Sequence, residues 1–445
     1  MSKKVLSLIL AMTLTLTMAS CGSKSTDAPD APDTPAPAAQ TSQDETKDGV
    51  HLRLVTQAAH SKTTADGKDA FYENLRPYLE ENNITLDIEY IANDNWQDYM
   101  TKLQTMIASG NTPDLLYVPA EGENMAYNMN ITTSLKPYLD QHPDIVEDYE
   151  KNVPKSLRNA TLHDGEPYGL VHLWECSALW LNTNRLKEAG LEVPDINWTW
   201  DEFEQYCEAL SDPANNKYAI SSPSSYYLYN QWLYSFGTGY LDDSYTEVTF
   251  DSDASVELLD WWAGAVEKGW ASAYNPASGG TEAQDLMNGT IAMANTGRWS
   301  LATFADNDFT DLAVVYVPVK NSPRKSFAFA SFQVCGASEN FEAAAALACW
   351  TASADYVSKM GVVAGEIPSR YDCMTPEELP FEFQNQEIFF DMPDDALSMQ
   401  NPSYFADLGN AWQSAYTAAI AGEKESAAAC ADAAQEMRSI VANNR

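Results

Sequence analysis

One stretch of the chain, residues 165–182, limits the possible folds more than any other. It opens with glycine and proline turn signals and continues as the largely apolar run GLVHLWECSALWLN, which predicts a buried strand. His172, Trp174 and Glu175 lie inside this run, although burying a charge without a partner is costly. We therefore expect this strand to pass from one lobe of the molecule to another and to line a binding site on its way.

The composition is that of a folded, strongly acidic protein. Of 445 residues, 45% are hydrophobic and 11% are aromatic, enough for the cores of two or three domains. Acidic residues outnumber basic ones 64 to 26, for a formal net charge of −38. Because phosphate binding needs a basic face, we expect no nucleic-acid partner. We interpret the acidity as a solubility feature of an exposed surface.

The N-terminus has the pattern of an export signal. Two lysines at positions 3 and 4 precede an apolar stretch, residues 5–17, that is too short for an ordinary transmembrane helix. Small residues then lead to Cys21, an order that resembles the signal of a bacterial lipoprotein, with Met18 where leucine is usual. The resemblance implies cleavage before Cys21 and lipidation of its thiol. The alternative is a plain signal peptide with an incidental cysteine.

Residues 1–20 are therefore interpreted as a lipoprotein signal peptide and residues 21–49 as a lipidated, disordered tether. The tether is rich in Ala, Pro, Asp, Thr and Ser and has no large apolar side chain, so it cannot bury a core. Two or three acyl chains on one cysteine anchor a protein stably. We expect the folded body to lie at the extracytoplasmic face of the cell membrane, held there through Cys21.

The remaining cysteines form no recognisable metal or redox motif. They are widely scattered, lack a CxxC pair and lie in mostly apolar surroundings. An export compartment permits disulfides, but the sequence leaves any pairing open, and we expect buried free thiols. HExxH, GxSxG and P-loop motifs are missing from the sequence. We therefore expect no metal and no cofactor. The cysteines concerned are Cys176, Cys207, Cys335, Cys349, Cys373 and Cys430.

From residue 51 onward, strand and helix patterns alternate. The clearest cases are the period-two alternation of ITLDIEYI and the helical spacing of the apolar residues that follow Trp96. Such alternation favours an α/β fold with parallel strands. We predict strands at 51–57, 84–91, 115–118, 291–299, 312–319 and 331–337. We predict helices at 69–81, 96–110, 199–210, 253–269, 341–354 and 425–441.

Several short motifs follow one another in a characteristic order. They are residues 96–110 with TPD at 112–114, the run 165–182, NTNRLKEAG at 182–190, WTWDEF at 198–203, GTIAM at 289–293, GRW at 297–299 and GEIPSR at 365–370. This order resembles that of family 1 extracellular solute-binding proteins, the substrate-capturing lipoproteins of ABC importers, which serve mostly for sugars. The maltose-binding type is the familiar example. The resemblance extends from about residue 50 to the end of the chain.

The resemblance implies an α/β fold of the two-lobed, periplasmic-binding-protein type (type II). Each lobe is then a β-sheet flanked by helices, and the ligand lies in the cleft between the lobes. Residues 50–172 and 331–390 would form lobe 1, and residues 173–330 and 391–445 would form lobe 2. The resemblance further implies a non-enzymatic monomer that captures a carbohydrate, closes around it and presents it to the transmembrane subunits of an ABC permease.

The same resemblance implies which side chains contact the ligand. A carboxylate at the crossover strand accepts hydrogen bonds from sugar hydroxyls, and a tryptophan after the AM motif covers the apolar CH face of a sugar ring. For each candidate a structural role stays open, such as an ion pair of Glu175 with Arg298 or Arg370. Whether Trp174 or Glu175 faces the cleft is also open. The candidate ligand-binding residues are Glu175, Trp299, Trp174, Tyr227, Glu121, His60, Trp412 and Arg298.

Two other functions remain alternatives. A surface glycan-processing enzyme would need two carboxylates on either side of the scissile bond, and 64 acidic residues make such a pair impossible to locate from sequence. A receptor for a peptide or a polyol would share the predicted fold and differ only in its ligand.

Overall fold

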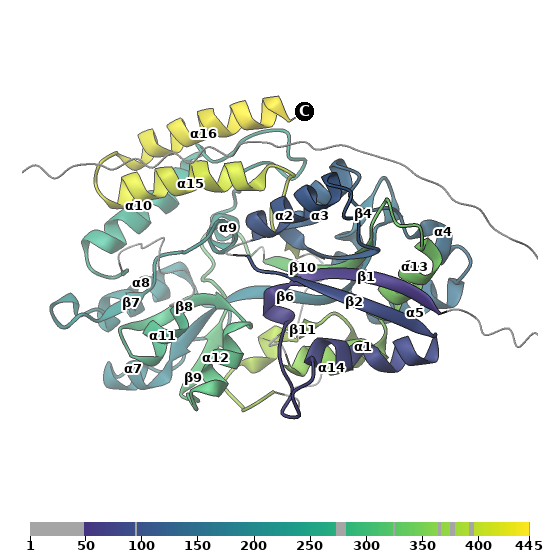
Figure 1. Cartoon of the computed structure of the whole chain (residues 1–445). Helices are drawn as coiled ribbons and strands as arrows, with labels where there is room; N and C mark the ends of the chain where they lie inside the picture. The colour runs from purple at the N-terminus through teal and green to yellow at the C-terminus, as the bar shows by residue number, and fades with distance from the viewer. Residues whose placement is uncertain are drawn as a thin grey trace, which may run out of the picture. The chain divides into compact units, whose positions relative to one another are not determined.

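One 14-residue strand, β6 (Gly169–Asn182), runs through the centre of the sheet in the computed structural model (Figure 1). Its residues 169–176 pair antiparallel with β10 (Ser326–Val334). Its residues 177–182 pair antiparallel with β8 (Ile291–Gly297) and β9 (Leu312–Val315). Every residue of β6 except Glu175 is buried. The prediction of a buried strand is confirmed, and this strand joins two groups of strands.

The structure describes residues 49–93, 96–272, 282–323, 325–363, 366–373, 379–390 and 396–444. The predicted signal peptide, nearly all of the predicted tether and the predicted lipidation site at Cys21 lie outside the described residues. In the described part of the chain, no helix combines the length and the apolar character needed to cross a bilayer.

The first group of strands contains β1 (Val50–Gln57), β2 (Ile84–Ile91) and β3 (Leu115–Pro119). β1 lies between the other two and runs parallel to both. The helices α1 (Ala70–Glu81) and α2 (Trp96–Ala108) follow β1 and β2, at the positions that the apolar periodicity predicts. The predicted parallel α/β order is therefore confirmed for this part of the chain.

The strand β10 makes the sheet mixed, because it lies between β3 and β6 and runs antiparallel to both. The predicted strand at 331–337 is wrong at both ends, since β10 spans Ser326–Val334. Pairing with β6 decides where it begins, because Phe327 is already opposite Cys176. We call β1, β2, β3, β10 and residues 169–176 of β6 the first half-sheet.

The second half-sheet consists of β7 (Tyr218–Ile220), β8, β9 and residues 177–182 of β6, with β7 parallel to β8. The predicted strand at 312–319 is too long, because β9 ends at Val315. The backbone N–H of Tyr316 donates to the carbonyl of Ile196, and that of Val319 donates to the carbonyl of Trp198. After Val315 the chain therefore leaves the sheet and pairs with residues 196–198.

The helices beside the second half-sheet pack through aromatic rings. α8 (Trp200–Leu210) begins with the predicted capping box, in which Thr199 and Glu202 exchange side-chain and backbone hydrogen bonds. α9 (Tyr226–Ser235) is buried along its whole length, and α10 (Asp253–Glu267) begins where the sequence predicts. The rings in contact between these helices include Trp200, Phe203, Trp232, Trp261 and Trp262.

The C-terminal helices α15 (Phe405–Ile420) and α16 (Ser426–Asn443) pack against each other and against α10, at the top of Figure 1. The last helix thus lies within two residues of its predicted bounds. The predicted helix at 341–354 is wrong at its end, because α13 (Phe341–Trp350) stops before α14 (Ala354–Val363) begins. The hydroxyl of Thr351 donates to the carbonyl of Ala348, which helps to close α13.

The remaining elements are short and connect or cover these parts. They are α3 (Ala120–Asn128), α4 (Lys136–Leu139), α5 (Pro143–Asn152), α6 (Lys155–Asn159), β4 (Leu162–His163), β5 (Glu166–Pro167), α7 (Thr183–Glu188), α11 (Glu282–Met287), α12 (Ser300–Asp306), β11 (Ile367–Pro368) and β12 (Leu397–Ser398). Short 3-10 turns lie at Ala58–His60, Pro213–Asn215, Tyr371–Cys373 and Gln386–Phe389. The six cysteines of the described residues are buried and unpaired.

Arg370 joins the segment after β11 to α5. Its Nη1 donates to Asp148 at 2.8 Å, and its Nε and Nη2 donate to Asp372 at 2.9 Å each. The side chain of Arg370 is 2% exposed. Both carboxylates hold the pKa of Arg370 above its ordinary value, against the effect of burial. The buried guanidinium is thus fully charged and multiply bonded.

We predict that Arg370→Met lowers the free energy of unfolding by about 2 kcal/mol or more, because several charge-assisted hydrogen bonds are lost together. Urea-induced unfolding measures the change. Arg76→Met is the matched control, since Arg76 pairs with Glu73 and Glu80 on the surface of α1 and its side chain is 43% exposed. Such surface pairs contribute about 1 kcal/mol or less. Equal losses in both variants would contradict this prediction.

Candidate functional site

The candidate site begins where β6 changes partners. Trp174 lies opposite Phe329 of β10 and Ile367 of β11, and Glu175 lies opposite Ala328. Because neighbouring side chains of a strand point to opposite faces of the sheet, Trp174 and Glu175 cannot line the same surface. Trp174 is only 2% exposed, whereas Glu175 is the one residue of β6 that is not fully buried.

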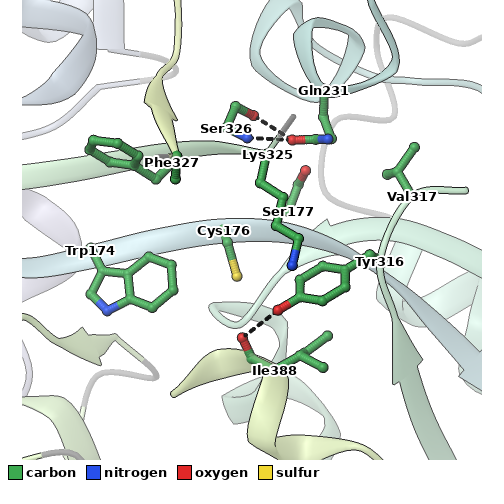
Figure 2. A pocket seen from close by; sticks show the side chains of 11 residues that line it. Trp174, Cys176, Ser177, Gln231, Tyr316, Val317, Lys325, Ser326, Phe327 and Ile388 are labelled. Atoms are coloured by element: carbon green, nitrogen blue, oxygen red, sulfur yellow. Dashed lines mark hydrogen bonds between the residues drawn. The ribbon is translucent and has the colours of Figure 1, made fainter. Parts of the chain in front are cut away.

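Figure 2 shows a small cavity on the Trp174 side of the strand, lined also by Cys176, Tyr316 and Lys325. The ammonium group of Lys325 lies 3.3 Å from the centre of the Tyr316 ring. The cavity measures about 20 Å³, which is room for a single water molecule. This cavity is therefore too small for a sugar.

The carboxylate of Glu175 is unusual for a buried group. Its Oε2 atom is buried and has no hydrogen-bond partner among the described residues, and the same holds for Oε2 of Glu366. Burial raises the pKa of Glu175 well above its ordinary value, the charge of Glu366 adds to this, and Arg298 acts in the opposite direction. Buried polar atoms normally have a partner, so one oxygen of each of these two carboxyl groups is open to a hydrogen bond from a ligand.

Arg298 connects the two half-sheets at this point. It follows β8 directly, is 3% exposed, and donates from Nη1 to the carbonyl of Glu366 at 2.7 Å. Its guanidinium lies 5.6 Å from the ring centre of Phe390. Of the two ion-pair partners suggested for Glu175, Arg370 is excluded because its guanidinium is bound to Asp148 and Asp372.

His60 lies behind Glu366. Its Nε2 is 3.7 Å from Glu366 Oε1, and its Nδ1 is 2.6 Å from the hydroxyl of Thr56. The ring is 8% exposed and packs between Phe71 and Tyr117, with ring centres 5.3 and 4.7 Å away. His60 thus contacts Glu366 and is connected to Glu175 and Arg298 through that residue.

Tyr227 and Trp299 form the aromatic part of the site. Trp299, at the start of α12, is 40% exposed and is one of the few exposed large apolar side chains among the described residues. Its ring centre lies 6.1 Å from that of Tyr227, whose hydroxyl donates to the carbonyl of Glu175 at 3.4 Å. The three residues Glu175, Tyr227 and Trp299 are therefore brought together by β6, α9 and α12.

Glu121, in the first turn of α3, lies close enough to Tyr227 and Tyr117 to influence them electrostatically. Burial raises the pKa of Tyr227 well above its ordinary value, and Cys176, Glu175 and Glu121 raise it further. Burial also raises the pKa of Tyr117, to which Glu366, Tyr99, Glu175 and Glu121 add. Both tyrosines therefore lie within electrostatic reach of Glu175 and Glu121.

Two other residues take structural positions. Trp412 lies in α15, is 2% exposed, and packs against the rings of Tyr229 and Tyr416 at 5.3 and 5.6 Å. It is thus part of the helical core and is not brought to the other candidates. His172 is 2% exposed and stacks on Phe332. Burial, with a smaller effect of His60, lowers the pKa of His172 to about 3, so it stays neutral.

Sequence reasoning missed Glu366 as a site residue, although it lies in the GEIPSR motif. The available signal was an acidic residue directly before the buried pair Ile367–Pro368 of β11. Only the pairing of β11 with Trp174 of β6 brings this carboxylate next to Glu175. In the part of the chain that the structure describes, no group of three or more His, Cys, Asp or Glu side chains could hold a metal ion.

A second set of polar contacts joins α3, beside the first half-sheet, to segments beside the second half-sheet. Asn401 donates from Nδ2 to the carbonyl of Ala120 and accepts at Oδ1 from the hydroxyl of Tyr245 at 3.2 Å. Asn124 donates to the carbonyl of Asn401 at 2.9 Å. Ala120 and Asn124 belong to α3, which follows β3, whereas Tyr245 lies in the hairpin between α9 and α10. Asn401 thus connects α3 with the hairpin between α9 and α10.

Comparison with known proteins shows the family. The model of the family described as bacterial extracellular solute-binding protein matches residues 74–389, more than half of the chain. The chain therefore belongs to the bacterial extracellular solute-binding proteins. This confirms the predicted family and identifies a binding protein rather than an enzyme.

Individual relatives are distant in sequence. A maltotriose-binding protein from Pyrococcus abyssi is 23% identical over 328 residues, which cover 70% of this chain and 69% of that protein. The ABC substrate-binding protein Lmo0181 from Listeria monocytogenes, solved with cycloalternan, is 22% identical with a TM-score of 0.77, covering 89% of this chain and 100% of that one. The sugar-binding protein MalE from Xanthomonas citri is 17% identical with a TM-score of 0.75, covering 89% and 98%. These structures confirm the two-lobed α/β fold.

The site predicts a pH-dependent stability. Burial raises the pKa of Glu121 from 4.5 to about 7. The folded chain therefore keeps this proton while the unfolded chain loses it, and stability falls as the pH rises from about 4.5 to about 7. Glu121→Gln removes this loss, so we expect the variant to match the wild type at pH 4 and to exceed it at pH 8.

The gain at pH 8 is at most about 3 kcal/mol, the equivalent of the pKa difference. Urea unfolding of both proteins at the two pH values measures it. Glu423→Gln, at an exposed position beyond the end of α15, is the control for removing a surface carboxylate. A pH profile that is the same for Glu121→Gln and the wild type would contradict the prediction.

Proposed function

We propose that this protein is the substrate-binding lipoprotein of an ABC importer and that it captures a carbohydrate in a cleft between its two lobes. The observations that carry the proposal are the unpartnered carboxylate oxygen of Glu175 and the exposed ring of Trp299, which Tyr227 connects by contacting the Trp299 ring and the carbonyl of Glu175. Sugars combine hydroxyl donors with apolar CH faces. Glu175 offers an acceptor for the hydroxyl groups, and Trp299 offers an apolar ring for the CH face.

The excess of acceptors supports a ligand that is rich in donors. Glu121, Glu175 and Glu366 all lie close enough to Tyr117 to raise its pKa, while the guanidinium of Arg298 is already bonded to the Glu366 carbonyl. A polyhydroxylated ligand would complete the hydrogen bonds of both buried carboxylates, and completing a buried hydrogen bond stabilises the complex. The binding of sugars by relatives of this chain, including maltotriose and cycloalternan, agrees with this proposal.

The two half-sheets support a closing motion. We propose that residues 50–172 and 331–390 form mainly lobe 1, and that residues 173–330 and 391–445 form lobe 2. Gln384 bonds to Leu312 and Val314 of the second half-sheet, so the return to lobe 2 would begin before residue 390. Bending where β6 changes partners would open and close the cleft, and a ligand that contacts both lobes favours the closed state.

We further propose that Cys21 carries the lipid anchor, that the protein works as a monomer at the extracytoplasmic face of the cell membrane, and that the closed, loaded form is read by the transmembrane subunits of a permease. The basis is the lipobox-like order of residues around Cys21. A polyol or a peptide as ligand is an outcome that the binding experiment below distinguishes.

We predict that Trp299→Ala lowers sugar affinity by about tenfold to a hundredfold, as expected for an aromatic contact at the centre of a site. Calorimetric titration of the mature protein with a panel of oligosaccharides, polyols and peptides identifies the ligand and measures this loss. Trp299→Phe should keep most of the affinity. Because Trp299 is 40% exposed, its removal should hardly change the melting temperature of the free protein.

The same panel separates the proposal from its alternatives. A sugar at a hundred times its dissociation constant should stabilise the protein by about 2.7 kcal/mol, and chromatography should recover it unchanged. Tight binding of a peptide or a linear polyol alone would replace the sugar as ligand. Cleavage of the sugar would contradict the proposed function.

In contrast to Trp299→Ala, Trp412→Ala should destabilise the free protein strongly, by about 3 kcal/mol or more, because Trp412 is 2% exposed.

We predict that Asn124→Ala weakens ligand binding about fivefold without touching the ligand. The Asn124–Asn401 hydrogen bond joins the proposed lobe 1 to the proposed lobe 2, so losing about 1 kcal/mol there favours the open state. Titration calorimetry gives the affinity, and small-angle scattering of the free protein gives its dimensions. Asn444→Ala is the matched control, since it removes a surface bond from Asn444 to the carbonyl of Ile440. Equal affinities of both variants would disprove the bridging role.

A further inference from the structure

The ring of Trp299 lies directly against the backbone of Gly297. A Cβ atom added to Gly297 would be 1.8 Å from Cζ3, 2.1 Å from Cε3 and 2.4 Å from Cη2 of the indole. These are neighbouring atoms of the six-membered ring, and all three distances are far below a van der Waals contact. Only a residue without a side chain fits beneath the ring in its present position.

The backbone of Gly297 cannot easily move away from the ring. Gly297 is the last residue of β8 and pairs with Ser177 of β6. Its carbonyl accepts a hydrogen bond from Nε1 of Trp180 at 3.2 Å, and Trp180 is fully buried. A side chain at position 297 would therefore displace the ring of Trp299 and not the strand.

The backbone conformation does not explain the glycine. Gly297 is absent from the glycines with positive φ in the described chain, such as Gly289 and Gly237. Any residue could adopt its conformation without the strain that a positive φ imposes. The close approach of the indole is thus the feature that requires glycine at this position.

We propose that Gly297 is a positioning residue that holds the plane of Trp299, and that the resulting fixed platform makes the site select ring-shaped sugars over acyclic polyols. This inference rests on the proposed function. With one face against Gly297 and 40% of its surface exposed, the indole presents a flat apolar area to the cleft. The ring of Tyr227, inclined by 47° at 6.1 Å, bounds this area.

The selection follows from the shapes of the two ligand classes. A pyranose ring carries a flat patch of CH groups that covers an aromatic plane without any change of conformation. A linear polyol has no such patch and must lose rotational freedom in order to lie flat, which costs affinity. A platform with a fixed plane therefore favours the pyranose, whereas a mobile indole would adapt to both.

The positioning is tested first without ligand, by nuclear magnetic resonance of the mature protein. The ring current of Trp299 should shift the Hα resonances of Gly297 strongly upfield, and Trp299→Ala should return them toward ordinary values. Gly297→Ala should move the indole N–H resonance of Trp299, which the missing signal in Trp299→Phe identifies. Ordinary Gly297 shifts in the wild type would overturn the positioning role.

The selection is tested by a double-mutant cycle with maltotriose and ribitol as probes. We expect the wild type to prefer maltotriose and Gly297→Ala to bind it about tenfold more weakly, the size of one aromatic contact, with ribitol affinity nearly unchanged. In the Trp299→Ala background, Gly297→Ala should have no further effect. Gly264→Ala is the matched control, because a Cβ at Gly264 meets no atom within 4 Å.

Each other result counts against the proposal. A similar loss from Gly297→Ala with and without the indole would show that residue 297 acts through the strand. Equal affinity of the wild type for both probes would overturn the selection. Binding of neither probe would overturn the selection as stated for these probes, the oligosaccharide panel would decide the sugar function, and the resonance experiment would decide the positioning of Trp299 by Gly297.

Discussion

The whole molecule depends on a single strand that has to satisfy two sets of neighbours. Between Cys176 and Ser177, the partner of β6 changes from β10 to β8, and β6 stays central on both sides of that point because β11 and β9 flank it. Every backbone group in a buried strand needs a partner, and β6 finds its partners in both half-sheets. The site lies where this exchange occurs, and its shape follows from the exchange.

The electrostatics of the site follow from the same geometry. β6 carries Glu175 into a buried position, and β11 brings Glu366 to it, so two carboxylates face one guanidinium, that of Arg298. Burying such groups without a partner is costly, and in the proposed function the donors of the ligand offset this cost. A ligand that contacts both proposed lobes would then favour their closed arrangement.

Most of the local structure could be predicted from sequence. The strands β1, β2 and β3 and the helices around them follow periodicity, and the capping box at Thr199 and Glu202 is a local signal that no distant contact can override easily. The errors lie where distant segments decide. β9 ends early because residues 316–319 pair with residues 196–200, and β10 begins early because β6 offers it partners. In the site, Glu175, Tyr227 and Trp299 do meet, whereas Trp412 belongs to the helical core and Glu366 was overlooked.

By itself, the sequence determined the α/β class, the family and the central strand, because each is encoded in the order of neighbouring residues. Tertiary structure alone decided which side of β6 faces the site, which carboxylate joins Glu175, and why position 297 is a glycine. The reason is that these depend on pairs such as Trp174 with Ile367 and Gly297 with the ring of Trp299. Strand register and ring packing set these contacts, and neither is written in any one segment of the chain.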